Sequence, residues 1–219
     1  MKMGTLLLDE LRGFARSKVM IALWIGLPAL SVLVNLLQPE TEGIPLLLFV
    51  AVLVGSIGGT LSAVLLSTTI TSERNRHVYD LFLVRPVKRA EILMAKYFAA
   101  LLCLLGAVVA SIGLAVIVDA ISGTPIAGGT AQVGESLLLS LAGILIASSA
   151  GLLFGVLINS IAVSAILSVY LGNQLSAIII LPTVLVEGLN VAVFVTMVGV
   201  GVPALLLSVA ILVFRKKSL

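Results

Sequence analysis

The side chains that could support acid–base or metal chemistry are few and widely separated in this sequence. His77 is the only histidine and Cys103 the only cysteine among 219 residues. No His, Cys, Asp or Glu residues have the spacing of a metal site, and no glycine-rich phosphate-binding loop ending in Gly-Lys-Ser/Thr occurs. Because the acids are also scattered, we expect no enzyme active site, no metal site and no resident cofactor in this chain.

The longest charged stretch of the chain is Ser72–Lys96, and its pattern suits contact with another protein. A short helix there would present Tyr79, Leu81 and Phe82, with arginines on both sides. Pro86 would end that helix, because the residue before a proline is disfavoured in the helical conformation. From the residues alone, a docking site for a soluble partner and an ordinary solvated basic loop are both open.

Two side-chain amides, Asn173 and Gln174, lie in the middle of an apolar run that spans residues 161–181. An amide without a partner is costly in hydrocarbon, so these side chains should face another helix or a cavity. A hydrogen bond between helices is one interpretation, and a substrate pathway is the other.

The elements that position these residues are six apolar runs. The chain is 60% hydrophobic and 11% charged, whereas soluble domains are about 45–50% apolar and about 25% charged. A spanning helix needs about 20 apolar residues, and these runs do not alternate as the strands of a membrane barrel do. We predict one all-α, polytopic membrane domain over residues 1–219. Its expected spans are about 19–37, 44–70, 97–121, 137–158, 161–181 and 191–214.

The basic residues indicate how these spans are oriented. All 13 lysines and arginines fall before the first run, between the second and third runs, or after the sixth. Basic residues concentrate on the cytoplasmic side of membrane proteins, so six spans with both termini in the cytoplasm account for every one of them. We expect a location in the cell membrane. Only Asn159 and Ser160 separate the fourth and fifth runs, which predicts a tight hairpin on the same side.

The stretch Thr5–Lys18 has the pattern of an amphipathic helix that lies in the membrane interface. A simple extension of the first span into water is the alternative. The expected apolar face consists of Leu7, Leu11, Phe14 and Ala15, and the expected polar face of Asp9, Glu10, Arg12 and Arg16.

Small residues recur at every fourth position in two of the runs, which lets helix backbones approach closely. We expect them to serve packing within the chain, with subunit dimerisation as the alternative. They are Gly55, Gly59 and Ala63 in the second run, and Gly143, Ala147, Gly151 and Gly155 in the fourth.

The charged stretch resembles the signature region of type 2 ABC exporter permeases, the NosY-like or multi-copper-maturation permease group. Those chains carry a pattern close to E-R-E-x-G-T-L-E-x-L-L-x-x-P-V-x-R-x-E-I-L-x-x-K after the second span. The matching residues here are Glu73, Arg74, Asp80, Leu81, Pro86, Val87, Arg89, Glu91, Ile92, Leu93 and Lys96. His77 and Val78 replace the usual Gly and Thr, which affects where the short helix starts. Residues 10–18 are similar to the interfacial elbow of that family.

In that family the short helix is a coupling helix that sits in a groove of an ATP-binding subunit. The resemblance therefore implies a membrane-spanning permease subunit of an ATP-driven ABC transporter, and we expect an exporter. The residues implied for ATPase coupling are Glu73, Arg74, His77, Val78, Tyr79, Asp80, Leu81, Phe82 and Pro86. Those implied for the elbow are Glu10, Arg12, Phe14 and Arg16.

The resemblance also implies the partners of this chain. They are an ABC ATP-binding subunit, which would hold ATP and Mg, and a second permease subunit in a homodimer or heterodimer. The lipid bilayer surrounds the spans, and no nucleic acid is expected. The alternative function is that of a non-transporting polytopic membrane scaffold or assembly subunit.

Overall fold

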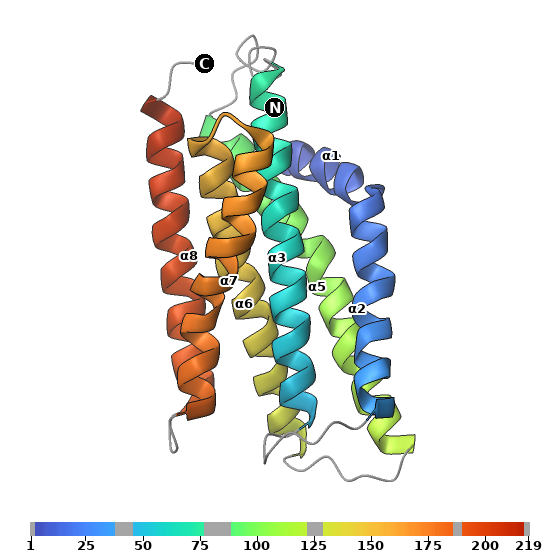
Figure 1. Cartoon of the computed structure of the whole chain (residues 1–219). Coiled ribbons are helices and arrows are strands. Elements are labelled where there is room, and N and C mark those ends of the chain that lie inside the picture. Colours follow the sequence, from blue (N-terminus) through green and yellow to red (C-terminus); the bar gives the residue numbers. More distant parts are fainter. Residues whose placement is uncertain (1–2, 38–45, 77–88, 122–128, 186–189, 217–219) are drawn as a thin grey trace.

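The computed structural model describes residues 3–37, 46–76, 89–121, 129–185 and 190–216. These residues form seven helices and no strand (Figure 1). The helices are α1 (Met3–Ala15), α2 (Lys18–Leu37), α3 (Leu46–Asn75), α5 (Arg89–Ile121), α6 (Gly129–Leu157), α7 (Ile161–Leu185) and α8 (Val191–Lys216).

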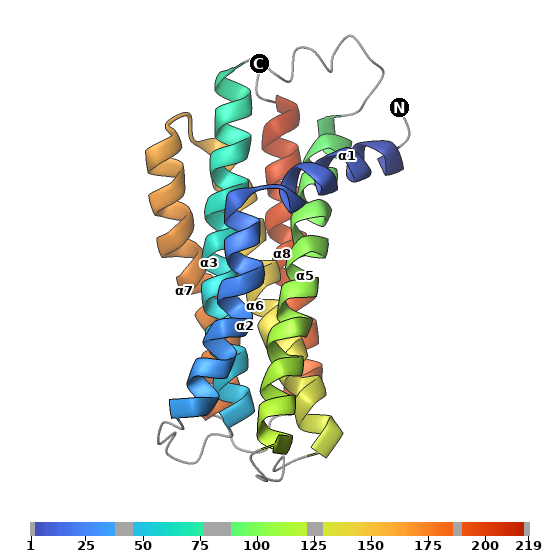
Figure 2. The same cartoon turned by 90° about the vertical axis from the view of Figure 1, so that its right-hand side faces the viewer.

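Six of these helices, α2, α3 and α5 to α8, are long and apolar enough to cross a membrane, so the prediction of an all-α protein with six spans is confirmed. The shorter α1 lies across one end of the bundle (Figure 2). We call this the α1 end. The coupling helix expected within 72–96 falls mainly on residues 77–88, which lie outside the described residues.

Several helices continue past the apolar runs that the sequence marks. The helix that contains the third apolar run, α5, already begins at Arg89, and α3 continues to Asn75. Hydropathy detects only the part of a helix that lies in hydrocarbon, whereas the backbone can stay helical where charged side chains reach water. As a result Glu73 and Arg74 belong to the last turn of α3 rather than to a separate loop.

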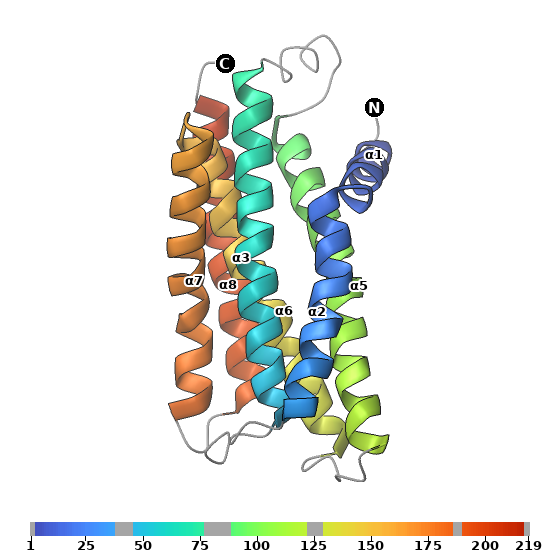
Figure 3. The same cartoon turned by 45° about the vertical axis from the view of Figure 1, so that its right-hand side comes forward.

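The bundle is built around α6. This helix is the most buried of the six spans, and it packs against α3, α5, α7 and α8. On one side α5 carries α2 and α1, and on the other side α7 and α8 form the least buried part of the bundle (Figures 1 and 3). The successive spans run in opposite directions, so that α1, the end of α3, the start of α5 and the α6–α7 turn meet at the α1 end (Figure 1).

The close contact between α3 and α6 depends on small residues, as the sequence predicts. A Cβ atom added at Gly55 would lie 3.0 Å from the Cα atom of Ser140, and one added at Gly155 would lie 3.0 Å from the Cα atom of Ser67. A Cβ atom at Gly151 would overlap the backbone of Ala63. These residues therefore pack helices within one chain.

Polar bonds add to this packing, both between α3 and α6 and between α7 and α6. The hydroxyl oxygens of Ser62 on α3 and Ser148 on α6 are 2.6 Å apart and share a hydrogen bond. Ser176 on α7 donates to the Gly143 carbonyl oxygen of α6 at 3.1 Å. Such bonds stabilise membrane bundles because no water competes for the donors.

We expect the substitution Gly151→Ala to destabilise the bundle, because the added methyl group would push α6 away from α3. Overpacking of this kind costs about 1–3 kcal/mol. Cys103 is buried and is the only cysteine, so its reaction with a thiol-reactive dye on heating in detergent measures unfolding. Gly134→Ala in the same helix is the control, because no atom lies within 4 Å of its added Cβ. Equal melting temperatures for both variants would contradict the packing role.

Candidate functional site at the α1 end

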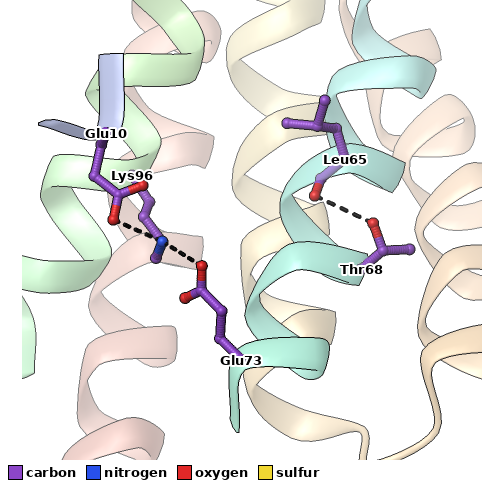
Figure 4. A network of polar contacts seen from close by, with 5 residues as sticks. All are labelled: Glu10, Leu65, Thr68, Glu73 and Lys96. Carbon is purple, nitrogen blue, oxygen red and sulfur yellow. Dashed lines mark hydrogen bonds and ion pairs between the residues drawn. The ribbon is translucent and has the colours of Figure 1, made fainter. Parts of the chain in front are cut away.

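Three elements are joined at the α1 end by one lysine. Lys96, two turns into α5, donates to Glu10 Oε1 of α1 at 2.7 Å and to Glu73 Oε1 of α3 at 2.8 Å (Figure 4). We call Glu10, Glu73 and Lys96 the ion cluster. It links the two helices that flank residues 77–88 to each other and to α1.

The burial of the ion cluster shows that it is more than a surface ion pair. The lysine is 3% exposed, whereas the side chains of Glu10 and Glu73 are 20% and 26% exposed. A buried ammonium group loses its hydration, and only close opposite charges and hydrogen bonds compensate this loss. The two carboxylates compensate the lysine and still reach water with their remaining surface.

The end of α3 is also bound to the turn between α6 and α7. The guanidinium group of Arg74 donates to the carbonyl oxygens of Gly155, Val156 and Ile158, and to the side-chain oxygen of Asn159 at 2.8 Å. Arg74 is only 8% exposed. A cation at this position is favourable, because the last carbonyl groups of a helix lack partners and carry partial negative charge.

The orientation of α1 differs from the prediction at two residues. Glu10 was expected on the polar face, but it lies on the inner face and binds Lys96. Ala15 was expected on the apolar face, but it is exposed. The reason is that Leu6 and Phe14 are buried and set which side of the helix faces α5. Arg12 and Arg16 are exposed, as expected for the outer face.

The comparisons with known proteins agree with this architecture. A family model described as ABC-2 family transporter protein matches residues 6–181, from α1 to the end of the apolar part of α7. The chain belongs to the ABC-2 transporter family. No curated protein matches the sequence. This protein is accordingly a permease subunit of an ABC transporter, and the NosY-like subgroup stays a prediction.

Membership of the ABC-2 family is consistent with the small number of side chains that could support acid–base or metal chemistry. ABC-2 permeases are membrane transport subunits that normally work with an ATP-binding subunit. Within the described ranges, no three His, Cys, Asp or Glu side chains lie close enough together to hold a metal ion. At the α1 end, the charged side chains of Glu10, Glu73, Arg74 and Lys96 connect helices.

The structure brings together some of the residues that the sequence singled out. Glu73 and Arg74 are joined to neighbouring helices of the same chain. The remaining residues implied for ATPase coupling lie outside the described residues and are His77, Val78, Tyr79, Asp80, Leu81, Phe82 and Pro86.

Sequence reasoning missed two of the residues that complete the contacts at the α1 end. Lys96 was expected only as the last match of the signature region, and Asn159 only as part of a short turn. The sequence held two signals, namely that opposite charges flank the coupling segment and that a polar pair separates two apolar runs. Neither signal identifies the partner, because the contacts join residues more than twenty positions apart.

The two amides of the fifth span lie on the surface of the single chain. Asn173 accepts a hydrogen bond from Ser56 of α3 at 3.2 Å, so it does connect two helices. Asn173 and Gln174 are nevertheless both exposed, near the middle of α7.

We expect Lys96→Met to destabilise the permease by about 2 kcal/mol. The substitution leaves two carboxylates without their cation, and the loss is smaller than the ~3–5 kcal/mol of fully buried pairs because both carboxylates retain water. The dye reaction of Cys103 on heating provides the measurement.

Two variants control this test. Arg12→Met removes an exposed cation from α1 and should leave the melting temperature almost unchanged. Adding Glu10→Gln and Glu73→Gln to Lys96→Met removes the uncompensated charges and should restore part of the loss. If Lys96→Met is as stable as Arg12→Met, the ion cluster does not hold the α1 end together.

Proposed function

We propose that this ABC-2 permease couples ATP hydrolysis by a separate ATP-binding subunit to the export of a substrate across the cell membrane. The observation that carries the proposal is the attachment of both flanks of residues 77–88. On one flank Glu73 and Arg74 bind neighbouring helices, and on the other flank Lys96 binds α1 and α3. Residues 77–88 are the part of the chain that resembles the coupling helix.

Attached flanks are what a mechanical coupling element requires. A partner that displaces residues 77–88 would act on α3 and α5, the two spans that leave this segment. The ion cluster resists their separation, because pulling Lys96 away from the carboxylates would leave buried charge without compensation. Force would therefore pass into the bundle as a joint movement of α1, α3 and α5.

The distribution of charge supports a cytoplasmic location for the α1 end. Exposed basic side chains gather there on α1, at the start of α2 and just after α3, namely Arg12, Arg16, Lys18 and Arg76. Near the opposite end α5 and α6 carry the acids Asp119 and Glu135. By the positive-inside rule the α1 end, and with it both termini, faces the cytoplasm.

The exposed amides of α7 support a second permease subunit on that side of the bundle. Asn173 and Gln174 lie at mid-span, where contact with lipid tails would be costly. The spans α7 and α8 are also the least buried of the six. A second subunit placed against α7 would cover the amides, and the polar surface between the two subunits would form the substrate pathway.

The first test concerns the ATP-binding subunit. We expect the double variant Leu81→Asp, Phe82→Asp to lose binding to the ATPase encoded beside the permease by about tenfold or more, as when a central contact residue is removed. Co-purification and ATP hydrolysis by the complex are the measurements. Gly4→Asp, an exposed position of α1, is the control. If no ATPase associates with the wild type, or if the double variant couples normally, the proposal fails.

The second test concerns the second permease subunit. In a Cys103→Ser background we expect Gln174→Cys to form a disulfide-linked dimer when membranes are oxidised. Ile25→Cys on α2 is the control, because Ile25 is exposed and apolar but lies on the other side of the bundle. In a heterodimer, the cross-link would form with a cysteine in the paired permease. Equal cross-linking of both variants, or none at Gln174, would place the interface elsewhere.

A further inference from the structure

The carbonyl groups at the end of α6 are gathered around one buried side chain. Arg74 Nη1 donates to Gly155 O at 3.4 Å and to Val156 O, and Nη2 donates to Ile158 O and to Asn159 Oδ1 at 2.8 Å. These acceptors lie in the last turn of α6 and in the turn that leads into α7. One guanidinium group thus satisfies several carbonyl groups that a helix end leaves without partners.

Two neighbours of Arg74 bind the same turn. Thr71 Oγ1 donates to Gly155 O at 3.2 Å, and Asn75 Nδ2 donates to Asn159 O at 2.8 Å. Arg74 and Asn75 follow Thr71 by three and four positions, so each lies beside Thr71 on the surface of α3. Three residues near the end of α3 are therefore bound to the end of α6 and the turn that follows it.

The contacts of Arg74 and the ion cluster connect α3 to different helices. The ion cluster ties α3 to α5 and α1, whereas Arg74 ties α3 to the α6–α7 turn. Only residues 158–160 separate α6 from α7. Because this connection is short, a movement of the turn would also move the ends of both helices. The helix α7 is the one that carries the exposed amides.

We propose that Arg74 is a positioning residue that binds the α6–α7 turn to the end of α3, so that displacement of residues 77–88 moves α7 together with α3. This inference rests on the proposed coupling to an ATP-binding subunit. Arginine suits the role because its planar group offers five donors in a fixed arrangement, whereas lysine offers a single point of charge. Arg74 lies only three positions before residues 77–88, the segment on which the partner would act.

The test follows the start of α7 during the nucleotide cycle. In a Cys103→Ser background, Val163→Cys places an environment-sensitive fluorophore on an exposed position in the first turn of α7. The permease in complex with its ATPase is measured without nucleotide and then with ATP, Mg and vanadate. We expect a change in emission for the otherwise wild-type permease.

We expect Arg74→Gln to reduce this emission change, compared at equal amounts of bound ATPase, by about fivefold or more, which is within the usual range of a coupling between sites. Arg74→Lys should retain part of the change, since it keeps the charge but not the set of donors. Arg76→Gln is the matched control, because Arg76 is exposed and two residues further along. Asn159→Ala weakens the same contact without altering charge, so it tests the inference even if Arg74→Gln folds poorly.

The outcomes separate the two proposals. If Arg74→Lys and Asn159→Ala, and Arg74→Gln where it folds, change emission as the wild type does, the inference is wrong and coupling itself stands. If the wild type neither binds the ATPase nor changes emission, the proposed function fails and the inference fails with it. If the emission change is reduced in the Arg74 and Asn159 variants but not in Arg76→Gln, the result supports the positioning role of Arg74.

Discussion

The close approach of α3 to α6 is the contact on which the rest of the bundle depends. Hydrocarbon provides no hydrophobic force between helices, so spans associate through tight packing and polar bonds instead. Glycines and alanines remove side-chain bulk along this contact, and Ser62 and Ser148 add a hydrogen bond within it. Because α6 also packs against α5, α7 and α8, the position of almost every span follows from where α6 lies against α3.

The charged contacts of Lys96 and Arg74 lie at the α1 end, and this position follows from the cost of burying charge. An ammonium or guanidinium group is stable in a bundle only where carboxylates, carbonyl groups or water compensate it. Lys96 and Arg74 lie where the helices leave the apolar runs, and each has several oxygen partners. The two contacts leave α3 in different directions, so the end of this helix connects both halves of the bundle.

The six spans could be predicted because hydropathy is a property of single segments. Each run of about 20 apolar residues must be a helix in lipid, whatever its neighbours are. The small residues of α3 and α6 could also be recognised, because their spacing of four places them on one helix face. The inner face of α1 could not be predicted correctly, since Leu6 and Glu10 face inward only in response to α5 and Lys96.

The amino-acid sequence by itself determined the number of spans, the grouping of the basic residues and the resemblance of residues 72–96 to a coupling segment, because each of these is written in consecutive residues. Only the tertiary structure decided what that segment is attached to. The partners of Arg74 lie more than eighty positions away, and Lys96 binds residues on two other helices. No local pattern specifies such pairs, since they arise only when packing of the spans brings the helix ends together.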